Sequence, residues 1–163
     1  MSRRLGAIVV MGLLVLSACE RREAAAPSPE AARFSHRLSA DISGDYRPVG
    51  EHSGQAASLF VGQAAAFTAW EAGQGGPPPL ILSLTGPQGP IQVTPDAYAI
   101  TDDTVQMSGS TPGGGVVRLQ GRINQGALAT ARRNLGDQTP VITGTVSVDG
   151  QRTAFALGWW GGD

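Results

Sequence analysis

The chain has 163 residues with 12 basic and 13 acidic side chains, and every basic residue is an arginine. The absence of lysine excludes a P-loop lysine, a Schiff-base lysine and a Ser–Lys dyad. A formal net charge of −1 lacks the electrostatic signature of a nucleic-acid-binding protein, so we expect no nucleic-acid partner.

Residues 1–18 have the layout of a secretory signal. Arg3 and Arg4 form a short basic region, and an uncharged, mostly apolar stretch follows from Leu5 to Leu16. This stretch is shorter than the ~20 apolar residues that a membrane-spanning helix needs. We therefore expect the segment to direct export of the chain and to have no place in the fold.

The sequence LSAC ends this segment, and Cys19 is the only cysteine of the chain. The four residues resemble the lipobox of bacterial lipoprotein precursors. The resemblance implies that Leu16, Ser17 and Ala18 are recognised by the signal peptidase, and that Cys19 carries a diacylglyceryl group as the first mature residue. Two or more acyl chains, palmitate among them, hold a protein stably on a membrane. A single cysteine also excludes an intramolecular disulfide, a cysteine zinc site and a CxxC redox pair.

Glu20 follows this cysteine. In many Gram-negative bacteria an aspartate at this position of a lipoprotein favours the inner membrane, so the resemblance implies the outer membrane, facing the periplasm. The next stretch, ERREAAAPSPEAAR, is charged and free of bulky apolar side chains. We expect residues 19–36 to form a lipidated flexible tether and residues 37–163 to form a single domain.

The 23 glycines and 11 prolines are dispersed between apolar stretches, which favours short strands joined by turns. Asp102 and Asp103 predict one turn, and the DG pair at 149–150 predicts a tight hairpin. ALATARRNLGD (127–137) predicts a helix that Gly136 ends, whereas AAAFTAWEAG (64–73) fits either a short helix or an irregular strand. In chain order, strands are expected at 41–50, 56–63, 80–86, 90–95, 97–101, 104–109, 116–123, 141–148 and 151–160.

Seven to nine short strands with one or two short helices predict a mainly β domain. The pattern leaves open whether the strands form an antiparallel sandwich or a small barrel. VGQAAAFTAWEAG, ALATARRNLGD and the terminal WWGGD resemble stretches of small lipoproteins of alphaproteobacteria. No activity is established for that group, so the resemblance implies boundaries and no mechanism.

Candidate binding residues are those whose chemistry suits a ligand. Arginines bind carboxylate or phosphate with two hydrogen bonds, but near the end of a helix they also offset the helix dipole and need no ligand. Adjacent tryptophans in a strand face opposite sides, so one is expected in the core and the other exposed or covered. The candidates are Trp70, Glu71, Arg132, Arg133, Asp137 and Trp160.

The sequence predicts no catalytic residue, metal site or cofactor. His36 and His52 lie in loop-like sequence, and no HxH, HExxH or GxSxG spacing is present. Glu71 is expected to be a solvated partner of an arginine. We therefore expect an envelope protein anchored in the membrane through Cys19, whose β domain binds an envelope partner or has a structural role without catalysis.

Two alternatives remain open from the sequence. A β-barrel would enclose an apolar small molecule, with Tyr46, Trp70, Tyr98 and Trp159 as candidate lining residues. An envelope hydrolase is the second alternative, because a Ser–His–Asp grouping is able to assemble from residues distant in the chain.

Overall fold

The computed structural model describes residues 33–50 and 55–162, so the predicted signal peptide, the lipobox with Cys19 and His52 lie outside the described residues. The described part contains nine strands and two helices. They follow in the order β1 (Phe34–Arg37), β2 (Gly44–Pro48), β3 (Ala56–Val61), α1 (Ala64–Glu71), β4 (Leu80–Gly86), β5 (Gly89–Thr101), β6 (Thr104–Ser110), β7 (Val116–Ile123), α2 (Gln125–Arg133), β8 (Ile142–Val148) and β9 (Gln151–Trp160).

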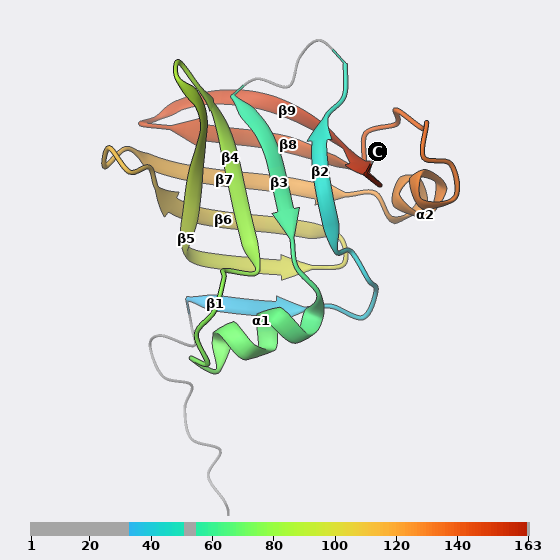
Figure 1. Cartoon of the computed structure of the whole chain (residues 1–163), viewed down its shortest axis with the longest axis horizontal. Coiled ribbons are helices and arrows are strands. Elements are labelled where there is room, and N and C mark those ends of the chain that lie inside the picture. The colour runs from blue at the N-terminus through green and yellow to red at the C-terminus, as the bar shows by residue number, and fades with distance from the viewer. Residues whose placement is uncertain (1–32, 51–54, 163) are drawn as a thin grey trace, which may run out of the picture.

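Strands β2 to β9 form a closed antiparallel barrel. Each strand pairs with the next one along the chain, and β9 pairs with β2 to complete the ring. β2, β3 and β4 cross in front of β6 to β9, and the long β5 belongs to both layers (Figure 1). The mainly β prediction is confirmed, and of the two architectures left open the chain adopts the barrel.

Strict alternation in the strands fills the interior with apolar side chains. In β7, Val117, Leu119 and Ile123 are buried, whereas Arg118 and Arg122 between them are exposed. Among the described residues, no polar or charged residue is fully buried. The largest side chains with less than 2% exposure are Tyr46, Phe67, Ile42, Leu59, Leu80, Leu82, Ile100, Leu119, Ile142, Leu157, Val61 and Val93.

β1 is added to the barrel by parallel pairing with the second half of β5, from Phe34 opposite Tyr98 to Arg37 opposite Thr101. The expected boundary at residue 37 is therefore too late, because residues 34–36 belong to the sheet rather than to a tether. A four-residue strand whose partner lies more than sixty positions ahead leaves no alternation pattern in the sequence. α1 packs along β1 below the barrel, and α2 lies beside the end of β9 (Figure 1).

Two expected boundaries are corrected. The strands expected at 90–95 and 97–101 are one continuous strand, β5, whose register shifts between Pro95 and Ala97, so that a bulge absorbs the extra residue. α2 ends at Arg133 rather than near Gly136, because Asn134 already has extended backbone (φ −133°, ψ 94°).

Two local predictions are confirmed, and one alternative that the sequence left open is resolved. Of the two alternatives for residues 64–73 the chain forms a helix, α1, and Gly73 follows it with a left-handed φ of 70°. Asp149 and Gly150 have φ values of 50° and 85°, as a two-residue hairpin turn requires. The turn at Asp102 and Asp103 joins β5 to β6. In the described ranges, no helix is both long and apolar enough to span a membrane.

Candidate functional site

A polar cluster joins α1 to the edge of the sheet. His36 of β1 places Nδ1 2.9 Å from Oε2 of Glu71, and the Tyr98 hydroxyl of β5 donates to Oε1 of the same carboxylate at 3.1 Å. Burial, and then the neighbouring carboxylate, raise the pKa of Tyr98. Glu71 is therefore the partner of a histidine and a tyrosine rather than of an arginine, and His36 is a half-buried strand residue rather than an exposed loop residue.

The Thr68 hydroxyl lies next to this cluster, so that a hydroxyl, an imidazole and a carboxylate follow one another as in the catalytic triad of a hydrolase. Thr68 Oγ1 lies 3.5 Å from Nε2 of His36, whose other ring nitrogen faces the Glu71 carboxylate. However, the Thr68 hydroxyl donates to the carbonyl oxygen of Ala64 one helical turn earlier, at 3.1 Å. The proton that a general base would remove is thus held by the helix backbone. The geometry is that of a brace between α1 and β1.

Aromatic rings enclose the same cluster. Trp70 meets Phe34 edge-on with ring centroids 6.2 Å apart, and Phe67 meets Tyr98 edge-on at 5.3 Å. The candidate residue Trp70 is therefore a packing residue that covers the helix–strand brace.

Arg132 at the end of α2 binds the segment that leads into β2. Its guanidinium donates to the carbonyl oxygens of Asp41 and Ser43, both at 2.8 Å, and lies 3.5 Å from the Asp41 carboxylate. The indole of Trp159 donates to the Ser43 carbonyl at 3.4 Å, and the Arg132 guanidinium lies 5.6 Å from the Trp159 ring centre. These contacts use the donors of Arg132 within the fold, so this residue is a clamp rather than a ligand-binding residue.

The other predicted site residues do not join Arg132. The Asp137 carboxylate accepts from the backbone N–H of Thr139 at 2.7 Å, and Thr139 lowers the pKa of Asp137. Arg133 is exposed on α2. Trp160 is covered by the guanidinium of Arg47, 3.2 Å from the ring centre. The structure thus separates Trp70 and Glu71, Arg132, Asp137 and Trp160 into different local contacts.

A surface that the sequence analysis did not single out carries most of the arginines. In the outer rows of β7 to β9, Arg118 pairs with Ser147, and Ser147 pairs with Arg152. Four residues farther along β7, Arg122 pairs with Thr143. All three arginines are exposed, so the outside of this half of the barrel carries long cationic side chains among neutral ones.

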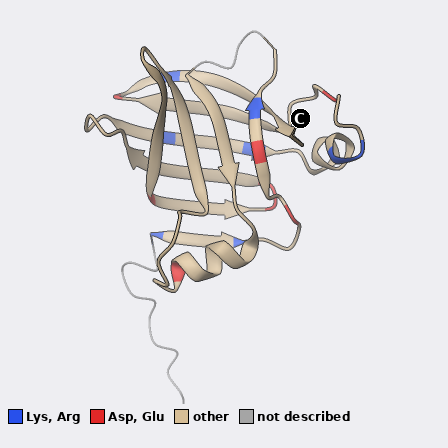
Figure 2. Ribbon diagram, in the orientation of Figure 1, with Lys and Arg blue, Asp and Glu red and all other residues tan. Residues whose placement is uncertain are grey.

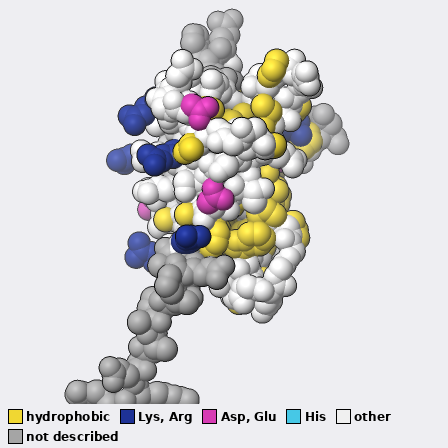
Figure 3. All heavy atoms as spheres, turned by 90° about the vertical axis from the view of Figure 1, so that its left-hand side faces the viewer, with side chains coloured by type: hydrophobic (Ala, Val, Ile, Leu, Met, Phe, Trp, Pro, Cys, Tyr) yellow, Lys and Arg dark blue, Asp and Glu magenta, His cyan; other side chains and the backbone are white. Residues whose placement is uncertain are grey.

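β1 continues the same surface across β5. Ser35 pairs with Ala99, and the exposed Arg33 and Arg37 flank Ser35 on the same side of the strand. We call this outer surface of β1, β5, β6, β7, β8 and β9 the arginine face, defined by Arg33, Arg37, Arg118, Arg122 and Arg152. Figure 2 shows basic residues of the arginine face on the rear strands of the barrel. In Figure 3 the molecule is turned so that the rear of the barrel in Figure 1 lies on the left, and basic side chains gather along that left edge.

Carboxylates lie at the margins of this face, and three of them have hydrogen-bond partners of their own, whereas the exposed Asp103 lies beside Thr104, the partner of Arg122. Asp96, at the β5 bulge, accepts from the Ser110 hydroxyl at 3.1 Å. Asp149, in the β8–β9 turn, accepts from the Val116 backbone at 2.9 Å. Asp102, in the β5–β6 turn, accepts from the N–H groups of Ser39 and Ala40 at 2.9 and 3.0 Å. Within the part of the chain that the structure describes, none of the five face arginines forms an ion pair.

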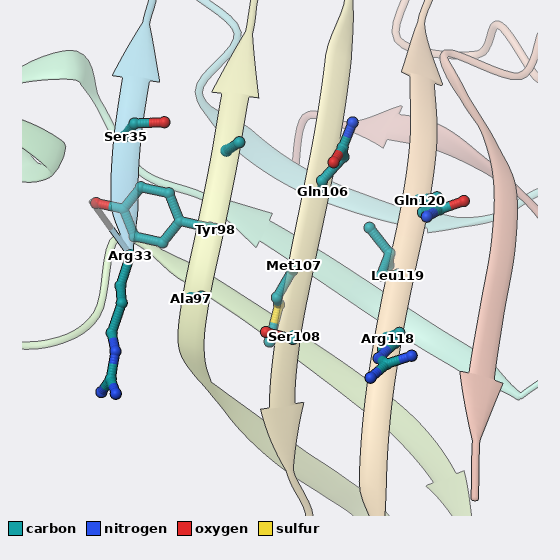
Figure 4. A pocket seen from close by; sticks show the side chains of 11 residues that line it. Arg33, Ser35, Ala97, Tyr98, Gln106, Met107, Ser108, Arg118, Leu119 and Gln120 are labelled. Atoms are coloured by element: carbon teal, nitrogen blue, oxygen red, sulfur yellow. The ribbon is translucent and has the colours of Figure 1, made fainter. Parts of the chain in front are cut away.

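The arginine face is hollowed across β1, β5, β6 and β7. A shallow depression of about 450 Å³ lies there, open to solvent. Gln106 and Gln120 pair across β6 and β7 and stand side by side in it, with Arg33 and Arg118 on opposite sides (Figure 4). Amides and guanidinium groups offer hydrogen-bond donors to an anion.

The expected lining of an internal ligand cavity is occupied by packing. Tyr46 is fully buried, and its hydroxyl donates to the Ile42 carbonyl oxygen at 2.6 Å. Tyr98 binds Glu71, while Trp70 and Trp159 pack against the core from its ends. Two depressions that described residues line, of about 450 and 530 Å³, lie on the outside of the barrel wall.

The arginine face has no motif by which sequence reasoning would have found it. The first and last of its arginines, Arg33 and Arg152, are more than a hundred positions apart in the chain. Only the strand pairing brings the five arginines to one surface. In residues 33–50 and 55–162, no three histidine, aspartate or glutamate side chains are grouped so as to hold a metal ion. Comparison of the chain with protein-family models, curated proteins and solved structures gives no match.

Proposed function

We propose that the chain is a cell-envelope lipoprotein, anchored through Cys19, whose barrel domain binds a partner through its outer surface without catalysis. The anchor rests on the basic, apolar and LSAC segments of the N-terminus. The observation that supports binding is the arginine face, where exposed guanidinium groups have no carboxylate partner among the described residues. Charged groups gathered on one surface attract and orient a partner of opposite charge.

A carrier function is the second candidate, because closed barrels of eight strands are of the size that holds one small ligand. The side chains that would line such a cavity are engaged in packing and internal hydrogen bonds. A native mass spectrum of the purified chain separates the two candidates. The binding proposal expects the mass of the chain with its covalent acyl groups, whereas an additional retained apolar molecule would favour the carrier.

The anchor is tested by metabolic labelling with a fatty acid. We expect the wild-type chain to incorporate the label and to fractionate with membranes, and Cys19→Ala to lose both, because the thiol is the attachment point. Ser28→Ala, in the same predicted tether, is the matched control and should be labelled like the wild type. Equal labelling of the wild type and Cys19→Ala would refute the anchor.

A further inference from the structure

We propose that the arginine face docks the barrel onto an anionic phospholipid surface. The inference rests on the proposed function and names the partner of the outer surface. It commits to the phosphate groups of a membrane rather than to a soluble anion, because the face is broad, its depression is open, and its cationic groups are distributed rather than converging on one point.

The spacing of the arginines suits many headgroups rather than one. Arg118 and Arg152 are two strands apart, which places their backbones about 10 Å from each other. Arg118 and Arg122 are four residues apart on one strand, about 13 Å. Arg33 lies three strands from Arg118, about 14 Å away. A single phosphate cannot contact all five arginines, which are spread from β1 to β9, whereas a lipid surface offers a phosphate to each.

The residues between the arginines favour a planar partner. They are neutral, so no carboxylate lies between the guanidinium groups. The two long ones, Gln106 and Gln120, carry amide donors that also suit phosphate oxygens. The short ones that lie in the rows between the arginines are Ser35, Ala97, Ala99, Ser108, Thr143, Thr145, Ser147, Ala154 and Ala156.

The chain enters the domain at the arginine face itself. Arg33 is the first described residue, and it is one of the five arginines. The residues between Cys19 and Arg33 span at most about 50 Å when fully extended, so an acyl group on Cys19 would keep this side of the barrel near the bilayer. A tethered domain meets the surface at a high effective concentration, so weak attraction by each arginine is enough to orient it.

Vesicle co-sedimentation of a chain without lipid tests the docking alone. The chain from residue 19 onward contains the whole described barrel, and Cys19→Ser removes the acylation site. We expect it to bind vesicles that contain phosphatidylglycerol at about 0.1 M salt and to be released at about 1 M salt, where screening acts over about 3 Å. Vesicles of phosphatidylcholine alone should not bind it.

A pair of double variants assigns the binding to the face. Arg118→Gln with Arg152→Gln should weaken partitioning about 25-fold, at about fivefold for each arginine near the surface. Arg47→Gln with Arg133→Gln removes the same charge from other surfaces and should partition like the parent. Circular dichroism spectra and melting curves of all three chains verify that the fold is retained.

Three results would overturn the docking. The first is that the chain does not bind phosphatidylglycerol vesicles at low salt, and the second is that both double variants lose vesicle binding equally. The third is that the chain binds soluble poly-glutamate as tightly as vesicles, which would assign the face to an acidic protein. Because the tested chain carries no acyl group, the outcome is independent of whether Cys19 is lipidated. Failure of the anchor and failure of the docking are thereby distinguished.

Discussion

At the residue scale, two facing glycines allow β7 and β8 to approach. Gly121 pairs with Gly144, and Gly144 pairs with Phe155 of β9. A Cβ on Gly121 would lie 3.3 Å from the Phe155 ring and 3.0 Å from methyl groups of Val105 and Ile142. The absence of side chains at this pair thus lets the core close behind the arginine face.

Gly144→Ala should destabilise the barrel by about 2–3 kcal/mol. Its Cβ would lie 2.0 Å from the carbonyl oxygen of Gln120 and 2.7 Å from the Cα of Gly121, so the strands would have to separate. Gly113→Ala is the matched control, since only a threonine hydroxyl at 3.9 Å is near that position. Urea unfolding measures both variants, and equal midpoints would refute the steric argument.

At the element scale, polar contacts hold the connection between β1 and β2 against the β5–β6 turn and α2. Asp102 of the β5–β6 turn binds the backbone of Ser39 and Ala40, which lowers the pKa of Asp102, chiefly through Ser39. Arg132 of α2 binds the carbonyl oxygens of Asp41 and Ser43. These contacts position β1, and with it the first two arginines of the face.

The two tyrosines of the chain, Tyr46 and Tyr98, predict a cooperative alkaline transition. Burial raises the pKa of both above the value of about 10 in an unfolded chain. A raised pKa in the folded state means that stability is intact below about pH 10 and falls as the pH rises toward the folded values. The chain has no lysine and its arginines stay charged, so few other groups titrate there.

Absorbance of tyrosinate, followed with pH beside circular dichroism, measures this transition. Folded protein should show no ionisation step near pH 10, and both tyrosines should ionise together with loss of the fold. The same chain in concentrated urea is the control and should ionise near pH 10. A step near pH 10 with an unchanged circular dichroism spectrum would contradict the burial of the tyrosine hydroxyl groups.

The sequence predicted the regular elements better than their connections. β4 and β7 match the expected ranges because alternation within one strand is a local signal. β1 and the His36–Glu71–Tyr98 cluster were missed because their partners are distant in the chain. The bulge in β5 was read as a break, since it interrupts the alternation while the strand continues.

At the scale of the whole molecule, composition concealed how the charges are arranged. A net charge near zero led us to expect no nucleic-acid partner and gave no sign of a basic surface. Five of the arginines nevertheless share one side of the barrel, while carboxylates near them lie in turns and at a bulge. Apolar and polar side chains alternate along the strands. Because β9 pairs with β2 and closes the ring, the apolar side chains share one interior and the arginines lie on the exterior.

Arginine-selective chemical footprinting of the native protein in its own membranes tests the orientation of the barrel most directly. Phenylglyoxal labelling followed by mass spectrometry should show Arg118 and Arg152 protected in membranes and reactive after solubilisation in detergent at high salt. Arg133, on α2, should react equally in both. Equal reactivity of Arg118 and Arg152 in the two preparations would contradict the proposal that the arginine face lies against the membrane.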